Sequence, residues 1–174
     1  MRVLIAFGSK RGGTAGLAGM IGDAFTDAGV EAMVSTAGDV DDLTGFDAVI
    51  VVGALYMNRW HRDARRFVRR HKDALRRLPV WLVSSGPLDD SAEEHDIPPT
   101  PQVRKIVTTI GAQGHATFGG RLESGARGFP AHAMARDNAG DWRDQTHVRR
   151  WVGSVCRHLA SQRSDTNGSE SRPS

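Results

Sequence analysis

The sequence predicts an α/β fold in which helices cover both faces of a parallel β-sheet. Three observations predict it. First, the runs at residues 2–7, 47–53 and 79–85 are short and apolar and lack in/out alternation, which is typical of strands buried on both faces. Second, segments with apolar residues at three- and four-residue spacing separate these runs, so strands and helices alternate. Third, a glycine-rich segment at 8–14 joins the first strand directly to the first helix.

The same patterns justify each element in order. Apolar stripes at helical spacing predict a helix through residues 17–25 and further helices at 62–77, 102–110 and 146–160. Gly29 is expected to end the first helix, since glycine is favoured just beyond a helix C-terminus. Weaker strand patterns at 31–36 and 115–118 complete an alternating β/α order. We therefore expect a doubly wound, five-stranded parallel sheet.

Length and composition indicate one domain. The chain has 174 residues, of which 25% are charged and 39% hydrophobic, and a single cysteine, Cys156. One cysteine cannot form an internal disulfide, which favours a reducing, cytoplasmic location. No signal-peptide pattern opens the chain, and no apolar stretch reaches the roughly 18 residues of a membrane-spanning helix. We expect a domain at 1–160 and a disordered polar tail at 161–174, which is nearly free of apolar side chains.

The segment 8–14 has the composition of a phosphate-binding loop. Its glycines let the backbone approach a ligand, Ser9 and Thr14 add hydroxyls, and the following helix directs its first amides toward an anion. The segment matches neither GxxxxGK[ST] nor GxGxxG, which disfavours ATP or GTP hydrolysis and a standard dinucleotide fold. A βα turn that binds nothing is the alternative. The candidate phosphate-binding residues are Ser9, Lys10, Arg11, Gly12, Gly13 and Thr14.

The motif Phe7-x-Ser9-x-x-Gly12-x-Thr14-x-x-x-Ala18 resembles the phosphate loop of the flavodoxins, which bind FMN. Residues 53–61 and 84–88 resemble the second and third flavin loops of that family, in the same order along the chain. Residues 118–122 and 140–144 are similar to a subgroup that includes the menaquinone-dependent protoporphyrinogen dehydrogenases. The resemblance covers residues 1–160. It implies a flavodoxin-like sheet with strand order 2-1-3-4-5 and FMN as cofactor.

The resemblance also implies where the flavin ring binds. Tyr56 and Trp60 each offer an aromatic surface for the ring, although Trp60 has an equally good alternative role as a core residue at the start of the next helix. Hydroxyls and backbone amides of the second and third loops would meet the polar edges of the ring. The expected contact residues are Ala54, Leu55, Tyr56, Met57, Asn58, Trp60, Ser84, Ser85, Gly86 and Pro87.

Charge is distributed unevenly along the chain, although the formal net charge is only +3. Residues 89–96 are interpreted as a solvated acidic loop. Residues 59–77 hold nine Lys and Arg against two Asp, and this stretch is either a solvated helix face or a surface that attracts an anionic membrane or substrate carboxylates. The seven scattered histidines form no HExxH motif and no His–Cys cluster, so we expect no metal site. Nucleic acid is not an expected partner, because no binding motif appears.

Two functions follow from these observations. The first is an FMN-dependent oxidoreductase of the protoporphyrinogen dehydrogenase type, in haem biosynthesis, with a quinone as electron acceptor and peripheral membrane contact through residues 59–77. The second is a small electron-transfer carrier that docks on a redox partner protein. By resemblance such carriers are strongly acidic, so the basic balance favours the enzyme. The same fold with a deazaflavin is a third interpretation. No catalytic residue is assigned.

Overall fold

The structure is a computed structural model, and it describes residues 1–8, 13–86, 97–119, 121–122, 140–141 and 143–169. Its strands are β1 (Arg2–Gly8), β2 (Glu31–Thr36), β3 (Ala48–Tyr56), β4 (Arg59–Trp60), β5 (Val80–Ser85), β6 (Gly114–Phe118), β7 (Arg121–Leu122) and β8 (Gly140–Asp141). Its helices are α1 (Gly13–Asp27), α2 (Arg62–Arg70), α3 (Lys72–Leu75), α5 (Pro101–Ile110) and α7 (Gln145–Ser169).

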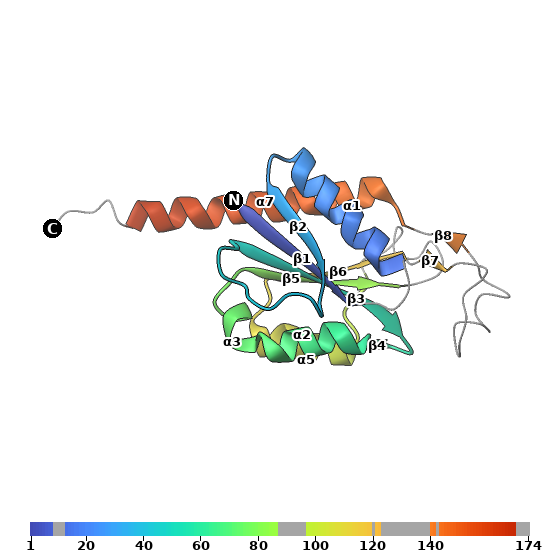
Figure 1. The fold of residues 1–174 in the computed structure, drawn as a ribbon. Coiled ribbons are helices and arrows are strands. Elements are labelled where there is room, and N and C mark those ends of the chain that lie inside the picture. The colour runs from blue at the N-terminus through green and yellow to red at the C-terminus, as the bar shows by residue number, and fades with distance from the viewer. Residues whose placement is uncertain (9–12, 87–96, 120, 123–139, 142, 170–174) are drawn as a thin grey trace.

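The five long strands form one parallel sheet in the order β2-β1-β3-β5-β6 (Figure 1). This order is the one that the flavodoxin resemblance implies, since the two-residue β4 only pairs antiparallel with the end of β3 and adds no strand to the parallel series. The strands β1, β3 and β5 are buried almost throughout, which explains why their sequences lack alternation. The doubly wound parallel sheet is confirmed.

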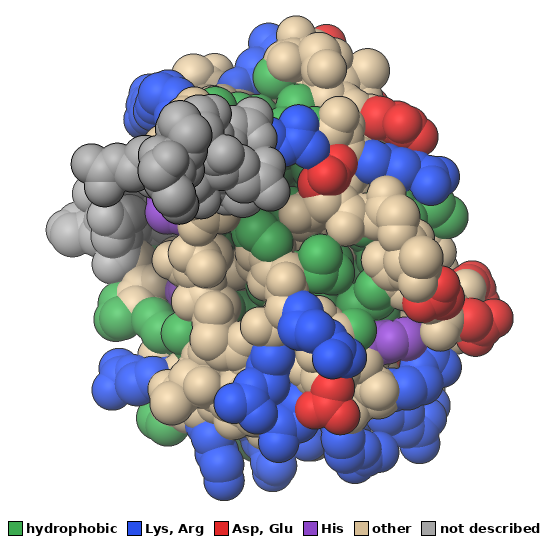
Figure 2. Space-filling model, turned by 90° about the vertical axis from the view of Figure 1, so that its left-hand side faces the viewer, with side chains coloured by type: hydrophobic (Ala, Val, Ile, Leu, Met, Phe, Trp, Pro, Cys, Tyr) green, Lys and Arg blue, Asp and Glu red, His purple; other side chains and the backbone are tan. Residues whose placement is uncertain are grey.

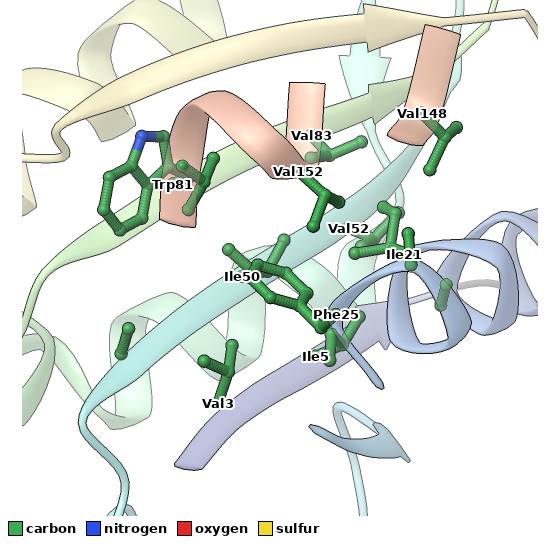
Figure 3. Packing of buried hydrophobic residues seen from close by; sticks show 14 of the residues in the cluster. Val3, Ile5, Ile21, Phe25, Ile50, Val52, Trp81, Val83, Val148 and Val152 are labelled. Carbon is green, nitrogen blue, oxygen red and sulfur yellow. The ribbon is translucent and has the colours of Figure 1, made fainter. Parts of the chain in front are cut away.

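Helices cover the sheet in two layers, α1 and α7 on one face and α2, α3 and α5 on the other (Figure 1). On the first face Phe25 of α1 and Val152 of α7 meet Ile50 of the central strand (Figure 3). On the second face Phe67 of α2 and Val103 of α5 pack against Val51. Alternate residues of each strand therefore enter different cores, and burial of both sets stabilises the three layers.

Local signals set the helix ends. Gly29, just beyond α1, has a φ of 75°, a left-handed conformation that favours glycine, so the helix end expected from the sequence is confirmed. The single helix expected at 62–77 is instead divided at His71, whose buried ring packs against Phe67 and lies 3.1 Å from the Val40 carbonyl oxygen. The helix is thus interrupted at a histidine that makes tertiary contacts, although the apolar pattern of the sequence predicts one continuous helix.

The last helix is longer than its apolar stripe predicts. We expected it to end at residue 160 and a polar tail to follow, but α7 continues to Ser169. Each added residue completes one backbone hydrogen bond, and Arg163 forms a 2.7 Å ion pair with Asp47. Among the described residues, no helix is both long and apolar enough to cross a membrane.

Candidate functional site

The carboxyl ends of β1, β3 and β5 lie side by side and define one edge of the sheet. Gly8 pairs in register with Gly53, and Gly53 with Ser84. The three loops singled out in the sequence therefore leave the sheet at one edge, on the right in Figure 1, where α1 begins. In open α/β sheets ligands bind outside this edge. The fold thus brings the predicted loops together.

The start of α1 is the candidate anion site. Ser9, Lys10, Arg11 and Gly12 lie outside the described residues, while Gly13 and Thr14 open the helix. The first amides of a helix have no intrahelical partner, and the helix dipole adds positive charge there. Thr14 is only 3% exposed, and no described residue hydrogen-bonds to its hydroxyl. A hydroxyl at the start of a helix, beside amides that have no intrahelical partner, fits a bound phosphate.

The second loop is a tight hairpin and not an open loop. Ala54, Leu55 and Tyr56 continue strand β3, and β4 returns antiparallel to them. Met57 and Asn58 form the turn with φ angles of 49° and 61°, the pattern of a two-residue type I′ hairpin. Asparagine tolerates this conformation, whereas methionine is strained by it. The Met57 side chain is 82% exposed at the tip.

Tyr56 is the aromatic side chain that remains at this edge. It is half-buried, and its ring meets the His61 ring edge-on at 6.4 Å and 67°. His61 in turn caps α2, because its Nδ1 accepts a 3.4 Å hydrogen bond from the Asp63 amide. Tyr56 therefore lies at the carboxyl end of β3, beside the residue that caps α2.

Trp60, which the sequence placed among the expected cofactor contacts, has its side chain in the core. The indole is 1% exposed, and its Nε1 donates a 2.9 Å hydrogen bond to Ser84 Oγ. It covers Gly53 so closely that a Cβ there would lie 2.5 Å from the indole Cδ2. Of the two roles that the sequence allowed for Trp60, the core role is the one observed.

Ser84 is likewise turned inward. Its hydroxyl is shared between Trp60 and His115, whose Nε2 lies 2.8 Å away, so the Ser84 side chain is not available as a ligand contact. Burial lowers the pKa of His115 to about 4, and the neutral ring can accept a hydrogen bond from the Ser84 hydroxyl. Sequence reasoning missed this Trp60–Ser84–His115 chain, since the three residues lie on separate elements.

Of the third loop, the structure describes Ser84, Ser85 and Gly86. The Ser85 side chain, on the opposite face from Ser84, is 6% exposed, and no described residue hydrogen-bonds to its hydroxyl. The Gly86 amide is already used, because it donates a 2.9 Å hydrogen bond to the Phe118 carbonyl. Pro87 and the acidic residues at 89–96 lie outside the described residues. Among the described groups of this loop, the Ser85 hydroxyl is therefore the candidate for a hydrogen bond to a cofactor.

Metal chemistry has no candidate site in the described part of the chain, where no group of three His, Cys, Asp or Glu side chains gathers. The described part of this edge instead brings together the N-terminus of α1 with Thr14, the Tyr56 ring at the end of β3 and Ser85 at the end of β5. These features define the class of doubly wound domains that bind a phosphate-bearing flat cofactor. A family model for the flavodoxin domain matches residues 4–129, and the chain belongs to this family.

Family membership implies FMN as the cofactor, in agreement with the resemblance read from the loops. Solved structures support the fold. A flavodoxin mutant from Pseudomonas aeruginosa is 18% identical, with a TM-score of 0.58, and the match covers 92% of this chain and 99% of that one. Rubredoxin oxygen:oxidoreductase from Desulfovibrio gigas is 14% identical, with a TM-score of 0.61, over 92% of this chain and 36% of that one. A flavodoxin from Streptococcus pneumoniae is 17% identical, with a TM-score of 0.55, over 93% and 99%. No curated protein sequence matches this chain.

Proposed function

We propose that this chain is an FMN-dependent oxidoreductase that takes electrons from a reduced, anionic organic substrate and passes them to a quinone. FMN supplies one- and two-electron redox chemistry when it is bound. In this proposal Thr14 and the first amides of α1 hold its phosphate, Tyr56 packs on its ring, and Ser85 reaches one polar edge. Protoporphyrinogen, which carries propionate carboxylates, is the substrate that fits the sequence resemblance, and its oxidation places the enzyme in haem biosynthesis.

The observation that carries the proposal is a basic face on the layer of α2, α3 and α5. Lys and Arg side chains gather along the lower part of Figure 2, the side on which this layer lies in Figure 1. We define the basic face by its exposed cationic residues: Arg59, Arg62, Arg66, Arg69, Lys72, Arg76, Arg77, Arg104 and Lys105. Within the described residues only Arg62 of this set has an ion pair, at 3.5 Å from Asp63.

The basic face begins at the proposed ring site. Arg59 is the register partner of Tyr56, and α2 starts directly after the hairpin. Arg70 does not belong to it, because its guanidinium is used to bind the carbonyls of Ala37 and Val40. A surface of one sign beside a site attracts ligands of the other sign and raises their local concentration. Substrate carboxylates would be drawn toward the ring by this field.

A small electron-transfer carrier is the second candidate. It is favoured by size, since the match to the Pseudomonas aeruginosa flavodoxin covers 99% of that protein. A carrier of this kind would use the basic face to dock on an acidic redox partner protein. The two candidates differ in what must react with the reduced flavin: a quinone for the enzyme and a protein for the carrier.

The test begins with the purified protein loaded with FMN. Under anaerobic conditions we expect turnover of protoporphyrinogen with a menaquinone analogue well above the spontaneous rate. The double substitution Arg66→Glu, Arg69→Glu should raise the KM for protoporphyrinogen, while Arg157→Glu on the exposed side of α7 serves as a matched control. Absence of turnover, together with fast electron exchange with a flavodoxin reductase, would replace the enzyme with the carrier.

The basic face also supports peripheral contact with the membrane in which a quinone resides. Each Lys or Arg near an anionic surface contributes about 1 kcal/mol of attraction. The wild-type protein should therefore co-sediment with vesicles of anionic phospholipid and not with vesicles of phosphatidylcholine. The Arg66→Glu, Arg69→Glu variant should lose this difference. Equal recovery with both kinds of vesicle would remove the membrane from the proposal.

A further inference from the structure

A chain of two hydrogen bonds connects β6 with the hairpin of β3 and β4. The indole Nε1 of Trp60 donates to Ser84 Oγ at 2.9 Å, and the same hydroxyl lies 2.8 Å from His115 Nε2. An indole N–H can only donate, so the Ser84 oxygen accepts from Trp60 and its own proton is directed to His115. Burial lowers the pKa of His115 to about 4, and the neutral ring has the lone pair that this bond requires. The direction of the whole chain is therefore fixed.

This chain holds the Trp60 side chain in one orientation. The indole is 1% exposed and lies so close to Gly53 that a Cβ there would be 2.5 Å from its Cδ2. Packing of this kind excludes water, and the hydrogen bond to Nε1 then selects one arrangement of the buried ring. Without an acceptor at residue 115 the Ser84 proton would be buried and unpaired, so the hydroxyl would turn toward another acceptor. His115 thus keeps the Ser84 hydroxyl in place for the indole.

The position of Trp60 is transmitted to Tyr56 through the hairpin. Trp60 pairs in register with Leu55, and the next pair toward the turn is Arg59 with Tyr56. The two residues between Tyr56 and Arg59 both have a positive φ, and a two-residue turn of this kind fixes the register of its strands. A displacement of the indole therefore displaces the backbone that carries the Tyr56 ring.

We propose that His115 is a positioning residue of the cofactor site, which sets the place of the Tyr56 ring through Ser84 and Trp60. β5 lies between β6 and β3 in the sheet, so His115 acts through these neighbours. An apolar side chain of similar size would fill the same space but leave the Ser84 proton unpaired. The proposal rests on the proposed function, in which the FMN ring packs on Tyr56, and not on which substrate donates electrons.

The chain has a single tyrosine, so the surroundings of Tyr56 can be measured directly. Full-length protein labelled with fluorotyrosine gives one fluorine NMR resonance, with or without flavin. His115→Phe removes the lone pair at similar ring size and should shift and broaden this resonance. His115→Gln, whose amide oxygen can accept from Ser84, should restore the wild-type resonance. His158→Phe is the matched control, because His158 packs against Trp81 near the opposite end of β5.

Bound FMN supplies a second readout, because a tyrosine ring stacked on a flavin quenches its fluorescence. In His115→Phe the emission of bound FMN should rise toward the level seen in Tyr56→Leu. The dissociation constant should rise by only about threefold or less, since the phosphate contacts are unchanged. Ser84→Ala, which interrupts the chain at its middle, should give the same changes. Far-ultraviolet circular dichroism checks that each variant is folded.

The two readouts separate this proposal from the placement of the cofactor. An unchanged fluorine resonance in His115→Phe, or an equal change in His158→Phe, would overturn the proposal. A resonance that moves without any change in flavin emission would show that the FMN ring lies away from Tyr56. That outcome would overturn the proposed ring site and leave the link between His115 and Tyr56 established.

Discussion

The indole Nε1 of Trp60 donates a 2.9 Å hydrogen bond to the hydroxyl of Ser84 and so holds β4 and the start of α2 against the sheet. Both side chains are almost completely buried. The backbone amide of Trp60 adds a second tie, a 2.9 Å hydrogen bond to Gln102 Oε1 on α5. The residue that looks like a ligand contact in the sequence is therefore an anchor for the hairpin that carries Tyr56.

Trp60→Phe tests this anchor role. The variant keeps an aromatic core residue but loses the hydrogen bond to Ser84, which costs about 1–2 kcal/mol of the free energy of unfolding. Urea denaturation of the apoprotein measures the loss. FMN affinity should change little, because the indole does not face the ligand edge. A variant of normal stability that binds FMN poorly would instead place Trp60 in the cofactor site.

The His115 ring makes stability depend on pH. Its pKa in the folded protein is lowered by burial from 6.5 to about 4, so the unfolded chain binds more protons between these values. Stability must then fall as the pH is lowered from 6.5 toward 4, and it is fully retained above 6.5. Urea midpoints at pH 7.5 and pH 5 should differ more for the wild type than for His115→Gln. Equal differences in the two proteins would show that other groups carry the effect.

Met57 provides a stabilising substitution. Its φ of 49° is a conformation that costs a non-glycine residue about 1–2 kcal/mol, and asparagine tolerates it better. Because the side chain is 82% exposed, its replacement removes little packing. Met57→Asn should therefore raise the free energy of unfolding by about 1 kcal/mol. Met33→Asn, at an exposed position on β2 without a positive φ, is the control and should bring no gain.

Thr14→Val tests whether the Thr14 hydroxyl contributes to phosphate binding. If the Thr14 hydroxyl bonds to the phosphate, its removal weakens FMN binding by roughly 1–3 kcal/mol at nearly constant side-chain volume. Thr26→Val on the same helix is the control, since its hydroxyl bonds to the Gly22 carbonyl at 3.0 Å, far along α1. Titration of both apoproteins with FMN gives the comparison. Equal affinities would reject the role assigned to Thr14.

Much of the fold was predictable because its signals are local. The apolar runs of β1, β3 and β5, the stripes of α1 and α5 and the glycine at 29 predicted their elements correctly without knowledge of distant residues. The division of α2 from α3 at His71 and the length of α7 were not predictable. Both depend on contacts with distant segments, the Val40 carbonyl in one case and Asp47 in the other.

For the candidate site, the position of the loops was predictable, but the orientation of their side chains was not. The sequence located its three loops, because βα loops of parallel strands must share the carboxyl edge of the sheet. It could not decide which side chains of those loops face the edge, since the type I′ turn at Met57–Asn58 sets a register in which Trp60 points inward. A shift of one residue in a strand exchanges the two faces. Ser84 and Ser85, which are adjacent in β5, likewise point to opposite faces of the sheet, and only Ser84 bonds to Trp60.

By itself the sequence determined the α/β class, the glycine-rich start of α1 and the excess of positive charge at 59–77, because apolar period, glycine and charge act through near neighbours. The strand order came from the resemblance to the flavodoxins. Only the tertiary structure decided that Trp60 is buried, that α5 extends the basic face, and that His115 reaches Trp60 through Ser84. The reason is physical: these relationships join residues far apart in the chain, and packing of the layers fixes their distances.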